Sequence, residues 1–348
     1  MSVAPVRRRV WYRRTGPVAA LAVAAVVVTL GVWALVSPRP SAYLIRMVFE
    51  RGGRSTATEM MRHAPTEGIT QKIGIAYGGK GRHPSMDVFT PADGAGPLPT
   101  VVWIHGGAWI SGSKQDVAPY LRILAARGFA AVGLDYSIAP AARYPTPVAQ
   151  VATALAFLDQ HATDLRVDLD RLVIAGDSAG AQIASQVATM VTNPDYAREV
   201  GVDPVIRPDQ LRGVVLNCGV YDLRSMSALT GVVGWGFHTA LWAYTGARAW
   251  ATTPAGTQMS TIDDVTAAFP PTFISGGDGD GLTATQSVPM ADRLRALGVD
   301  VTPLFWEGQQ PPLPHEYQFH LDDKAAQHAL DETVGFLDRV TAEVPAPR

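Results

Sequence analysis

Short apolar segments alternate with helical patterns through most of the chain, and this alternation constrains the fold more than any other feature. The runs of strand length are Val101–His105, Ala130–Asp135, Leu172–Ala175, Val214–Asn217, Thr272–Ser275 and Val299–Phe305. The helical patterns are Ala118–Arg127, Thr146–His161, Ala179–Met190, Gln286–Leu297 and Asp322–Thr341. Strands that are apolar on both sides and separated by helices are typical of a parallel sheet covered on both faces. The sequence therefore predicts an α/β fold with a mostly parallel central sheet.

Two segments interrupt the alternation. Gly219–Phe269 contains no strand-like run and carries Trp235, Trp242 and Trp250. We interpret residues 219–269 as an inserted cap that lies over the sheet, with ordinary core packing as the alternative explanation of the three tryptophans. Asn193–Asp209 contains three prolines and is predicted to be a surface loop.

Composition and charge exclude several classes of protein. The 348 residues allow one large domain or two smaller ones. Five arginines and no acidic residue fall within residues 1–17, which leaves the rest of the chain with 24 basic and 31 acidic residues. An acidic body does not favour nucleic-acid binding. A single cysteine, Cys218, excludes an intrachain disulfide and a cysteine-based zinc site, and no cofactor is indicated.

The N-terminal segment has the length and composition of a membrane anchor. Thr15–Pro38 carries no charged residue, and Val18–Val36 consists almost entirely of alanine, valine and leucine. At a rise of about 1.5 Å per residue such a helix spans roughly 28 Å, close to the thickness of the hydrocarbon core. The arginines are denser before this segment than after it, which predicts a cytoplasmic N-terminus and a domain outside the cytoplasm. A cleaved export signal and a buried soluble helix are the alternatives.

These features divide the chain into four parts. We expect a basic cytoplasmic tail at residues 1–17, a transmembrane anchor at 18–36, a linker or N-terminal cap at 40–70, and the α/β domain at 71–345. Within the linker, an amphipathic helix is expected around Tyr43–Phe49 and a Gly/Arg/Ser-rich stretch follows at Arg51–Ser55.

A candidate nucleophile lies between a predicted strand and a predicted helix. Gly176-Asp177-Ser178-Ala179-Gly180 follows the run Leu172–Ala175 and matches the pattern G-x-S-x-G. A sharp turn at this place exposes the serine hydroxyl, and the small residues two positions away on either side avoid a collision with the neighbouring chain. The alternative is a glycine-rich turn that carries a serine without a catalytic role.

A second glycine motif could supply the oxyanion donors that acyl transfer requires. The run from Val101 leads into His105-Gly106-Gly107-Ala108-Trp109. Backbone N–H groups can stabilise a developing oxyanion where side chains leave room for it. We name the N–H groups of Gly107, Ala108 and Ala179 as candidates. We interpret His105 as a structural residue, because it ends the strand that shapes this loop.

A serine nucleophile also needs a base and an acid that orients the base. His315 lies in a proline-rich loop before the last predicted helix, and His320 is the alternative base. Asp280 lies in the glycine-rich loop after Thr272–Ser275, and Asp278 is the alternative acid. A solvated turn without function is also possible, whereas the acid spacing and the distal glutamate of an EF-hand are missing.

Together these motifs resemble the α/β-hydrolase superfamily, in particular its hormone-sensitive-lipase-like and feruloyl-esterase-like branch. The resemblance covers roughly residues 85–340 and rests on four stretches: His105–Trp109, Asp135–Pro140 with Arg143–Pro145, Gly176–Gly180, and Asp280 to His315. It implies Ser178 as nucleophile, His315 as base and Asp280 as its partner. Ala108 stands where lipase-like relatives have a third glycine, so the resemblance does not identify one of the oxyanion donors.

The resemblance implies an esterase or lipase-type hydrolase that forms an acyl-enzyme on Ser178. Its expected substrate is a small-molecule or lipid-like ester, and its expected partner is the membrane, through the N-terminal helix. An amidase, a peptidase or an acyltransferase could use the same fold. A non-catalytic membrane-tethered binding protein is a further alternative, although such a protein would be expected to have lost Ser178, Asp280 or His315. The sequence does not indicate an oligomeric state.

Overall fold

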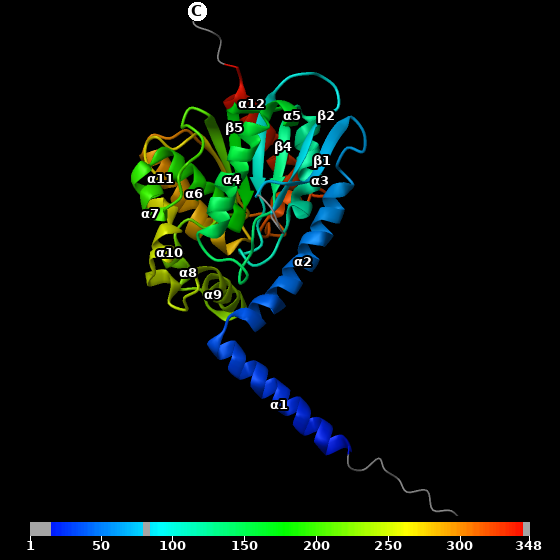
Figure 1. Cartoon of the computed structure of the whole chain (residues 1–348), viewed down its shortest axis with the longest axis vertical. Coiled ribbons are helices and arrows are strands. Elements are labelled where there is room, and N and C mark those ends of the chain that lie inside the picture. Colours follow the sequence, from blue (N-terminus) through cyan, green and yellow to red (C-terminus); the bar gives the residue numbers. More distant parts are fainter. Residues whose placement is uncertain (1–14, 79–83, 344–348) are drawn as a thin grey trace, which may run out of the picture.

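A central sheet of eight strands organises the domain in the computed structural model, which describes residues 15–78 and 84–343 (Figure 1). The strands lie in the order β1-β2-β4-β3-β5-β6-β7-β8. Their bounds are β1 Ile69–Ala76, β2 Ser85–Pro91, β3 Leu98–Ile104, β4 Ala130–Leu134, β5 Val167–Asp177, β6 Leu211–Asn217, β7 Thr272–Gly276 and β8 Val301–Phe305. β2 runs antiparallel to β1 and to β4, and the remaining pairs are parallel. The predicted α/β fold with a mostly parallel sheet is confirmed.

Helices cover both faces of this sheet. Their bounds are α1 Thr15–Val36, α2 Arg39–Met61, α3 Lys114–Ala126, α4 Thr146–Gln160, α5 Ala162–Leu165, α6 Ala179–Thr192, α7 Pro194–Val200, α8 Leu223–Met226, α9 Gly231–Thr245, α10 Pro254–Gln258, α11 Val288–Ala296 and α12 Lys324–Thr341. α3 and α12 pack on one face, and α4, α6 and α11 pack on the other.

The side chains of β3 point alternately into two hydrophobic cores, one on each face of the sheet. Val101 and Trp103 are buried in the cluster that contains α3 and α12, whereas Val102 and Ile104 are buried in the opposite cluster. Successive residues of a strand point to opposite faces, so a strand that is covered on both sides must be apolar throughout. This burial explains why the strand patterns of the sequence are continuous rather than alternating.

Residues 194–200 correct the prediction of a loop, because they form α7. Asn193 precedes this helix, and its side-chain oxygen accepts hydrogen bonds from the backbone N–H groups of Asp195 and Tyr196 at 3.1 and 3.2 Å. Pro194 occupies the first turn, where its missing N–H costs no helical hydrogen bond. An N-cap and a proline at this position are signals of a helix start rather than of a loop.

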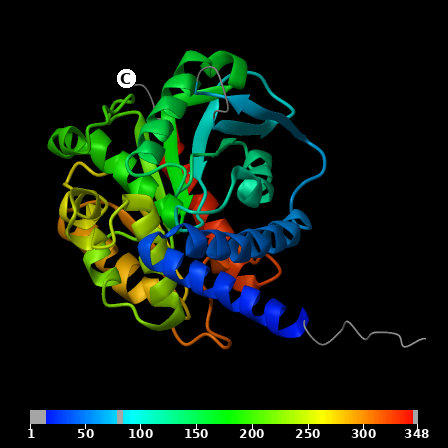
Figure 2. The same ribbon diagram turned by 60° about the horizontal axis from the view of Figure 1, so that its bottom comes forward.

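The insertion between β6 and β7 is helical, as expected, and contains α8, α9 and α10. It lies at one end of the domain, and α2 crosses the same end beside α9 (Figures 1 and 2).

The three tryptophans of the insertion have different surroundings. Trp250 is buried in the core, Trp242 carries the guanidinium group of Arg248 over its ring at 4.6 Å, and Trp235 is exposed. Core packing therefore accounts for Trp250 but not for Trp235.

α1 stands apart from the domain (Figure 1). Among the residues that the structure describes, Val18–Val36 is the one helical segment long and apolar enough to cross a membrane, and none of it is buried. Residues 1–14, which form most of the expected basic tail, lie outside the described residues.

α2 is continuous from Arg39 to Met61, so it includes both the helix expected around Tyr43–Phe49 and the Gly/Arg/Ser-rich stretch Arg51–Ser55. Glycine inside a helix is unfavourable by about 1 kcal/mol relative to alanine. At Gly53 the structure gives a reason for glycine, since a Cβ atom there would lie 3.2 Å from the carboxyl group of Asp116 on the neighbouring helix α3. Close packing of α2 on α3 therefore requires a small residue at this point.

Candidate active site

Ser178 lies in a tight turn between β5 and α6, as the motif predicts. Its backbone adopts φ 51° and ψ −117°, a conformation that a residue with a side chain rarely occupies. A Cβ atom at Gly176 would lie 2.5 Å from the backbone of Gly180, and one at Gly180 would lie 2.0 Å from the carbonyl oxygen of Ile104. The two glycines are thus required for the turn to close against β3.

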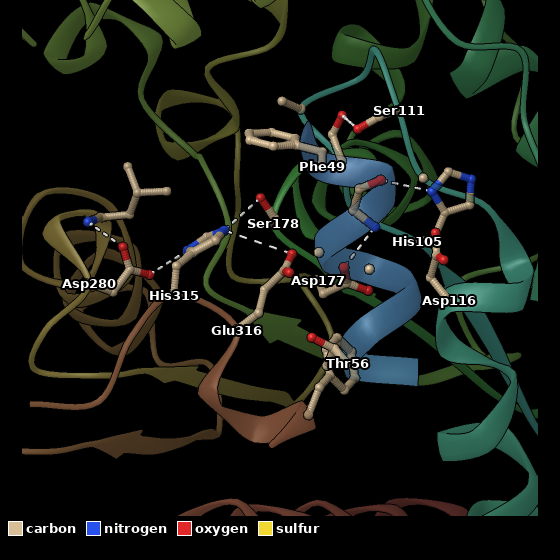
Figure 3. A pocket seen from close by; sticks show the side chains of 18 of the residues that line it. Phe49, Thr56, His105, Ser111, Asp116, Asp177, Ser178, Asp280, His315 and Glu316 are labelled. Carbon is tan, nitrogen blue, oxygen red and sulfur yellow. Dashed lines mark hydrogen bonds and ion pairs between the residues drawn. The ribbon is translucent and has the colours of Figure 1, made fainter. Parts of the chain in front are cut away.

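The structure brings His315 and Asp280 to this serine. His315 Nε2 lies 2.9 Å from Ser178 Oγ, and His315 Nδ1 lies 2.7 Å from Asp280 Oδ2 (Figure 3). The other carboxyl oxygen of Asp280 accepts the backbone N–H of Leu282 at 2.9 Å. The three side chains form one continuous hydrogen-bonded chain that ends at the serine hydroxyl.

The two alternative residues have other partners. Asp278 accepts the backbone N–H groups of Gln309 and Leu313 at 2.7 and 2.8 Å, and so ties the β7 loop to the loop that carries His315. These hydrogen bonds hold the pKa of Asp278 below its usual range. His320 Nδ1 lies 3.0 Å from Glu59 Oε2 on α2. Neither side chain takes part in the chain of hydrogen bonds at Ser178.

The loop after β3 presents backbone N–H groups beside Ser178. Gly107 and Ala108 have φ values of 104° and 52°, and both residues line the pocket that contains Ser178. Neither of them donates its backbone N–H to another residue in the described part of the chain. Ala179 is the first residue of α6, where the N–H has no partner within the helix. All three positions named from the sequence therefore have an N–H group available near the serine.

His105 helps to build this loop. It is buried, its Nδ1 lies 2.8 Å from the carbonyl oxygen of Gly106, and its ring stacks on Tyr136 at 4.3 Å. Tyr136 in turn donates its hydroxyl to the carbonyl oxygen of His105 at 2.9 Å. Burial lowers the pKa of His105, which keeps the imidazole neutral. These contacts agree with the structural interpretation of His105.

A cavity of about 590 Å³ opens above Ser178. Two segments outside the sheet supply its apolar walls. α2 contributes Val48 and Phe49, and the insertion contributes Leu229, Val233 and Phe237. The size falls within the range of small-molecule sites, and the walls are predominantly apolar. The geometry therefore places a serine hydroxyl, an imidazole and backbone N–H groups without other partners at the end of an apolar pocket.

Comparison with known proteins agrees with this architecture. Residues 86–294 match the model of the family described as BD-FAE. The chain belongs to the BD-FAE family. It is 26% identical over 253 residues to an esterase of Gibberella moniliformis, which covers 72% of this chain and 78% of the relative.

Solved esterase structures share the fold of this BD-FAE family member. Esterase B from Lactobacillus Rhamnosis superposes with a TM-score of 0.75 at 21% identity, over 87% of this chain and 96% of that one. The carboxylesterase EstE1 from a metagenomic library gives a TM-score of 0.67 at 20% identity, over 88% and 98% of the two chains. The protein is thus a carboxylesterase-type α/β hydrolase by family and by fold.

Two carboxyl groups at the site were not identified from the sequence. In this BD-FAE chain Asp177 accepts the indole N–H of Trp103 and the backbone N–H of Gly106, each at 2.7 Å. It thereby fixes the start of the loop after β3 relative to Ser178. Glu316 lies with Oε1 3.8 Å from His315 Nε2. Burial, together with the charge of Glu316, raises the pKa of Asp177 well above its usual range.

The signals for these two residues are weak in the sequence. Asp177 occupies a variable position of the G-x-S-x-G pattern, and Glu316 directly follows His315. In the structure Glu316 has φ 59°, a left-handed conformation that is uncommon for a residue with a side chain. This backbone turn directs Glu316 toward Ser178 and His315 rather than away from them (Figure 3).

The carboxyl groups around His315 favour its charged form. Burial lowers the pKa of His315, but the hydrogen bond to Asp280 and the charges of Glu316, Asp280 and Asp177 outweigh it and raise the pKa to about 9. Burial also raises the pKa of Asp280, but its hydrogen bond and ion pair with His315 hold that pKa below its usual range. The imidazole and the carboxylate thus stabilise each other as an ion pair.

Glu316→Gln is expected to shift the acid limb of the kcat/KM profile to lower pH. Only neutral His315 can accept a proton, so kcat/KM of the free enzyme should rise with pH up to the pKa of this residue, about 9. Removing the Glu316 charge lowers that pKa and leaves more neutral imidazole at neutral pH. Measurement of kcat/KM against pH tests the predicted shift. Glu332→Gln, at an exposed position of α12, is the control. An acid limb that stays in place or moves to higher pH would contradict the conclusion that the charge of Glu316 raises the pKa of His315.

Cys218, Asp280 and His315 also place one metal-binding atom each within 4.8 Å of one another. His315 Nδ1 and Asp280 Oδ2, however, are already hydrogen-bonded to each other at 2.7 Å. Burial raises the pKa of the Cys218 thiol well above its usual range. Two of the three candidate ligand atoms are thus already engaged in the chain of hydrogen bonds at Ser178.

Proposed function

We propose that the protein is a serine hydrolase of carboxylic esters that works through an acyl-enzyme. Ser178 is the nucleophile, His315 the base and Asp280 the residue that orients His315. The observation that carries the proposal is the chain of hydrogen bonds of 2.9 and 2.7 Å that joins the three side chains at the end of the pocket. A nucleophile, a base and an orienting acid within hydrogen-bond reach are the minimum set for this chemistry.

In the first half of the reaction, Ser178 Oγ attacks the ester carbonyl carbon as His315 Nε2 removes its proton. The positive charge on the imidazole is stabilised through Nδ1 by Asp280. Collapse of the tetrahedral intermediate breaks the bond to the alcohol oxygen, which takes the proton from His315. In the second half, His315 removes a proton from water, the hydroxide oxygen attacks the acyl carbon, and Ser178 leaves with the proton.

The backbone N–H groups of Gly107, Ala108 and Ala179 are proposed to bind the oxyanion. They carry no other hydrogen bond in the described part of the chain and lie on the two turns that meet at Ser178. Each such donor is worth on the order of 10²–10³ in rate, because it is fixed in place before the charge develops. Asp177 supports this arrangement by holding Gly106 at the start of the loop.

Ester substrates suit this site better than peptides. The pocket walls from α2 and the insertion are apolar, and several proteins with the same fold are named esterases. Esterase B, at 21% identity, is also known with a tributyrin phosphonate inhibitor. We propose a small-molecule or lipid-like ester as substrate for this chain.

We further propose that Val18–Val36 is an uncleaved membrane anchor. In this arrangement residues 1–17 lie in the cytoplasm, residues 40–70 link the anchor to the domain and cap it, and residues 71–345 form the hydrolase domain outside the cytoplasm. The exposure of the whole apolar helix and the arginines before it support this topology. A secreted domain released by signal cleavage is the alternative.

Covalent labelling tests the proposed function directly. A fluorophosphonate should modify the full-length protein once, and mass spectrometry of the peptides should locate the adduct on Ser178. The same preparation should hydrolyse p-nitrophenyl butyrate, and it should lose this activity as labelling proceeds. Labelling of another residue, or ester hydrolysis that persists after complete labelling, would refute the proposal. Absence of both labelling and hydrolysis would instead indicate the non-catalytic binding protein.

A further inference from the structure

The mouth of the pocket is bordered by apolar side chains that face solvent. Val48 and Phe49 on α2 and Val233 on α9 line the pocket, yet they are 63%, 45% and 63% exposed. These residues come from two helices that pack beside each other. The opening of the pocket is therefore an apolar slot between α2 and α9 rather than a polar cleft.

The exposed apolar surface extends from this slot along both helices. On α2 it includes Tyr43, Leu44 and Met47, which lie on the same helical face as Val48. On α9 it includes Val232, which is 83% exposed, and Trp235. α9 contains no acidic or basic residue apart from a histidine. We call these residues the membrane rim: Tyr43, Leu44, Met47, Val48, Phe49, Val232, Val233 and Trp235.

The membrane rim is continuous with the end of the proposed anchor. α1 ends at Val36 and α2 begins at Arg39, so the two helices meet at an elbow of two residues (Figure 1). A hollow at this elbow is lined by Ala34 and Leu35 in the last turn of α1, by Ser41 at the start of α2, by Trp235 and Trp242 of α9, and by Arg248 beyond α9. α9 therefore faces the end of α1 across this hollow.

The residue types at this level fit a membrane interface. Tryptophan is enriched where a chain passes between lipid and water, and here the guanidinium group of Arg248 stacks on the ring of Trp242 at 4.6 Å. Along α2, Arg39, Arg51 and Arg54 are exposed, and none of the three forms an ion pair with another described residue. An apolar face accompanied by arginines is typical of a helix that lies in the membrane interface.

We propose that the membrane rim inserts into the surface of the bilayer that holds α1, and that the substrate is a lipid ester that enters the pocket from this bilayer. The ester group would reach Ser178 through the slot between Val48 and Val233. This inference rests on the proposed function for the catalytic step and on the proposed anchor for the position of the bilayer. It adds the source of the substrate and the surface that receives it.

Site-directed fluorescence measures the insertion without relying on catalysis. Leu44→Cys and Val232→Cys, each labelled with NBD, are reconstituted as full chains in nanodiscs of equal parts phosphatidylcholine and phosphatidylglycerol. The native Cys218 is buried and the chain has no other cysteine. The rim labels should show blue-shifted emission and quenching by spin-labelled lipid, whereas a label at Asp338→Cys on α12 should show neither. Rim labels as accessible to water as the α12 label would overturn the proposal.

Charged substitutions test the delivery of the substrate. The double variant Leu44→Asp/Val232→Asp places two carboxylates on the membrane rim at residues that do not line the pocket. Hydrolysis of a long-chain ester dissolved in the nanodisc should fall roughly tenfold or more, since about 1.4 kcal/mol of weakened insertion suffices for a tenfold change. Hydrolysis of water-soluble p-nitrophenyl acetate should stay within about twofold of wild type.

A control variant separates the effect of weakened insertion from the effect of the added negative charge. Thr153→Asp/Gln327→Asp adds the same charge at exposed positions on α4 and α12, away from the rim, and should leave both activities unchanged. Equal loss in the rim variant and the control, or an unaffected rim variant, would contradict delivery from the bilayer. If the wild type hydrolyses neither ester, the proposed function fails, and the fluorescence result still decides the insertion.

Discussion

Replacing Ser178 by alanine is expected to lower kcat for p-nitrophenyl butyrate by a factor on the order of 10⁴–10⁶. The Ser178 hydroxyl lies 2.9 Å from His315 Nε2 and forms the bond to the acyl carbon in the proposed mechanism, and alanine offers no replacement for it. The residual rate should reflect only the oxyanion donors and the pocket acting on water. Because Ser178 sits at φ 51°, alanine inherits the same strained turn and should not relieve it.

Ser185→Ala is a suitable control for this variant. Ser185 is buried about two turns further along α6 and hydrogen-bonds to Thr261 at 3.0 Å, away from the reacting atoms. Its replacement should leave kcat within a few-fold of wild type. Circular dichroism of both variants checks that they fold. If Ser178→Ala kept most of the wild-type rate while Ser185→Ala lost it, Ser178 would not be the nucleophile.

The parts of the fold that the sequence predicts are those whose signals are local. β3 to β7 contain short apolar runs because both faces of the sheet are covered there. The turn at Ser178 is encoded by two glycines within five residues, and its need for them follows from contacts of 2.5 and 2.0 Å that a side chain would create. Family membership and fold agree with the resemblance that these motifs imply.

The elements that the sequence did not predict depend on contacts between distant segments. β1 lies at the edge of the sheet with most of its residues exposed, so it lacks the apolar pattern of the other strands. β2 is buried but follows no helix, and thus falls outside the alternation. α2 continues through Gly52 and Gly53 because α3 packs against it, and α3 lies some sixty residues further along the chain.

The pattern favours Asp280 over Asp278, but it does not contain the contacts that distinguish the two acids. Asp278 and Asp280 lie in one glycine-rich loop, and both follow the end of β7. Their difference arises from the loop that carries His315, which offers backbone N–H groups to one acid and an imidazole to the other. Glu316 was missed for the same reason, since its proximity to Asp177 depends on the fold.

This division of roles leads to opposite expectations for the two acids. Asp280→Asn should lower kcat by a factor on the order of 10³–10⁴. An asparagine amide would donate to His315 Nδ1, which moves the ring proton to Nε2 and removes the lone pair that accepts the proton of Ser178. The hydrogen bond to the backbone N–H of Leu282 can be kept by the remaining oxygen, so the loop should hold its shape.

Asp278→Asn, by contrast, should change kcat only a few-fold, because Asp278 contacts backbone N–H groups and not the reacting atoms. Its effect should appear as lower thermal stability, since a neutral amide accepts two N–H groups less strongly than a carboxylate does. The kcat of both variants and their melting temperatures distinguish the two roles. A large loss of kcat in Asp278→Asn together with a nearly wild-type kcat in Asp280→Asn would mean that Asp278, and not Asp280, orients His315. Equal losses would mean that the acid acts by holding the His315 loop rather than by orienting the imidazole.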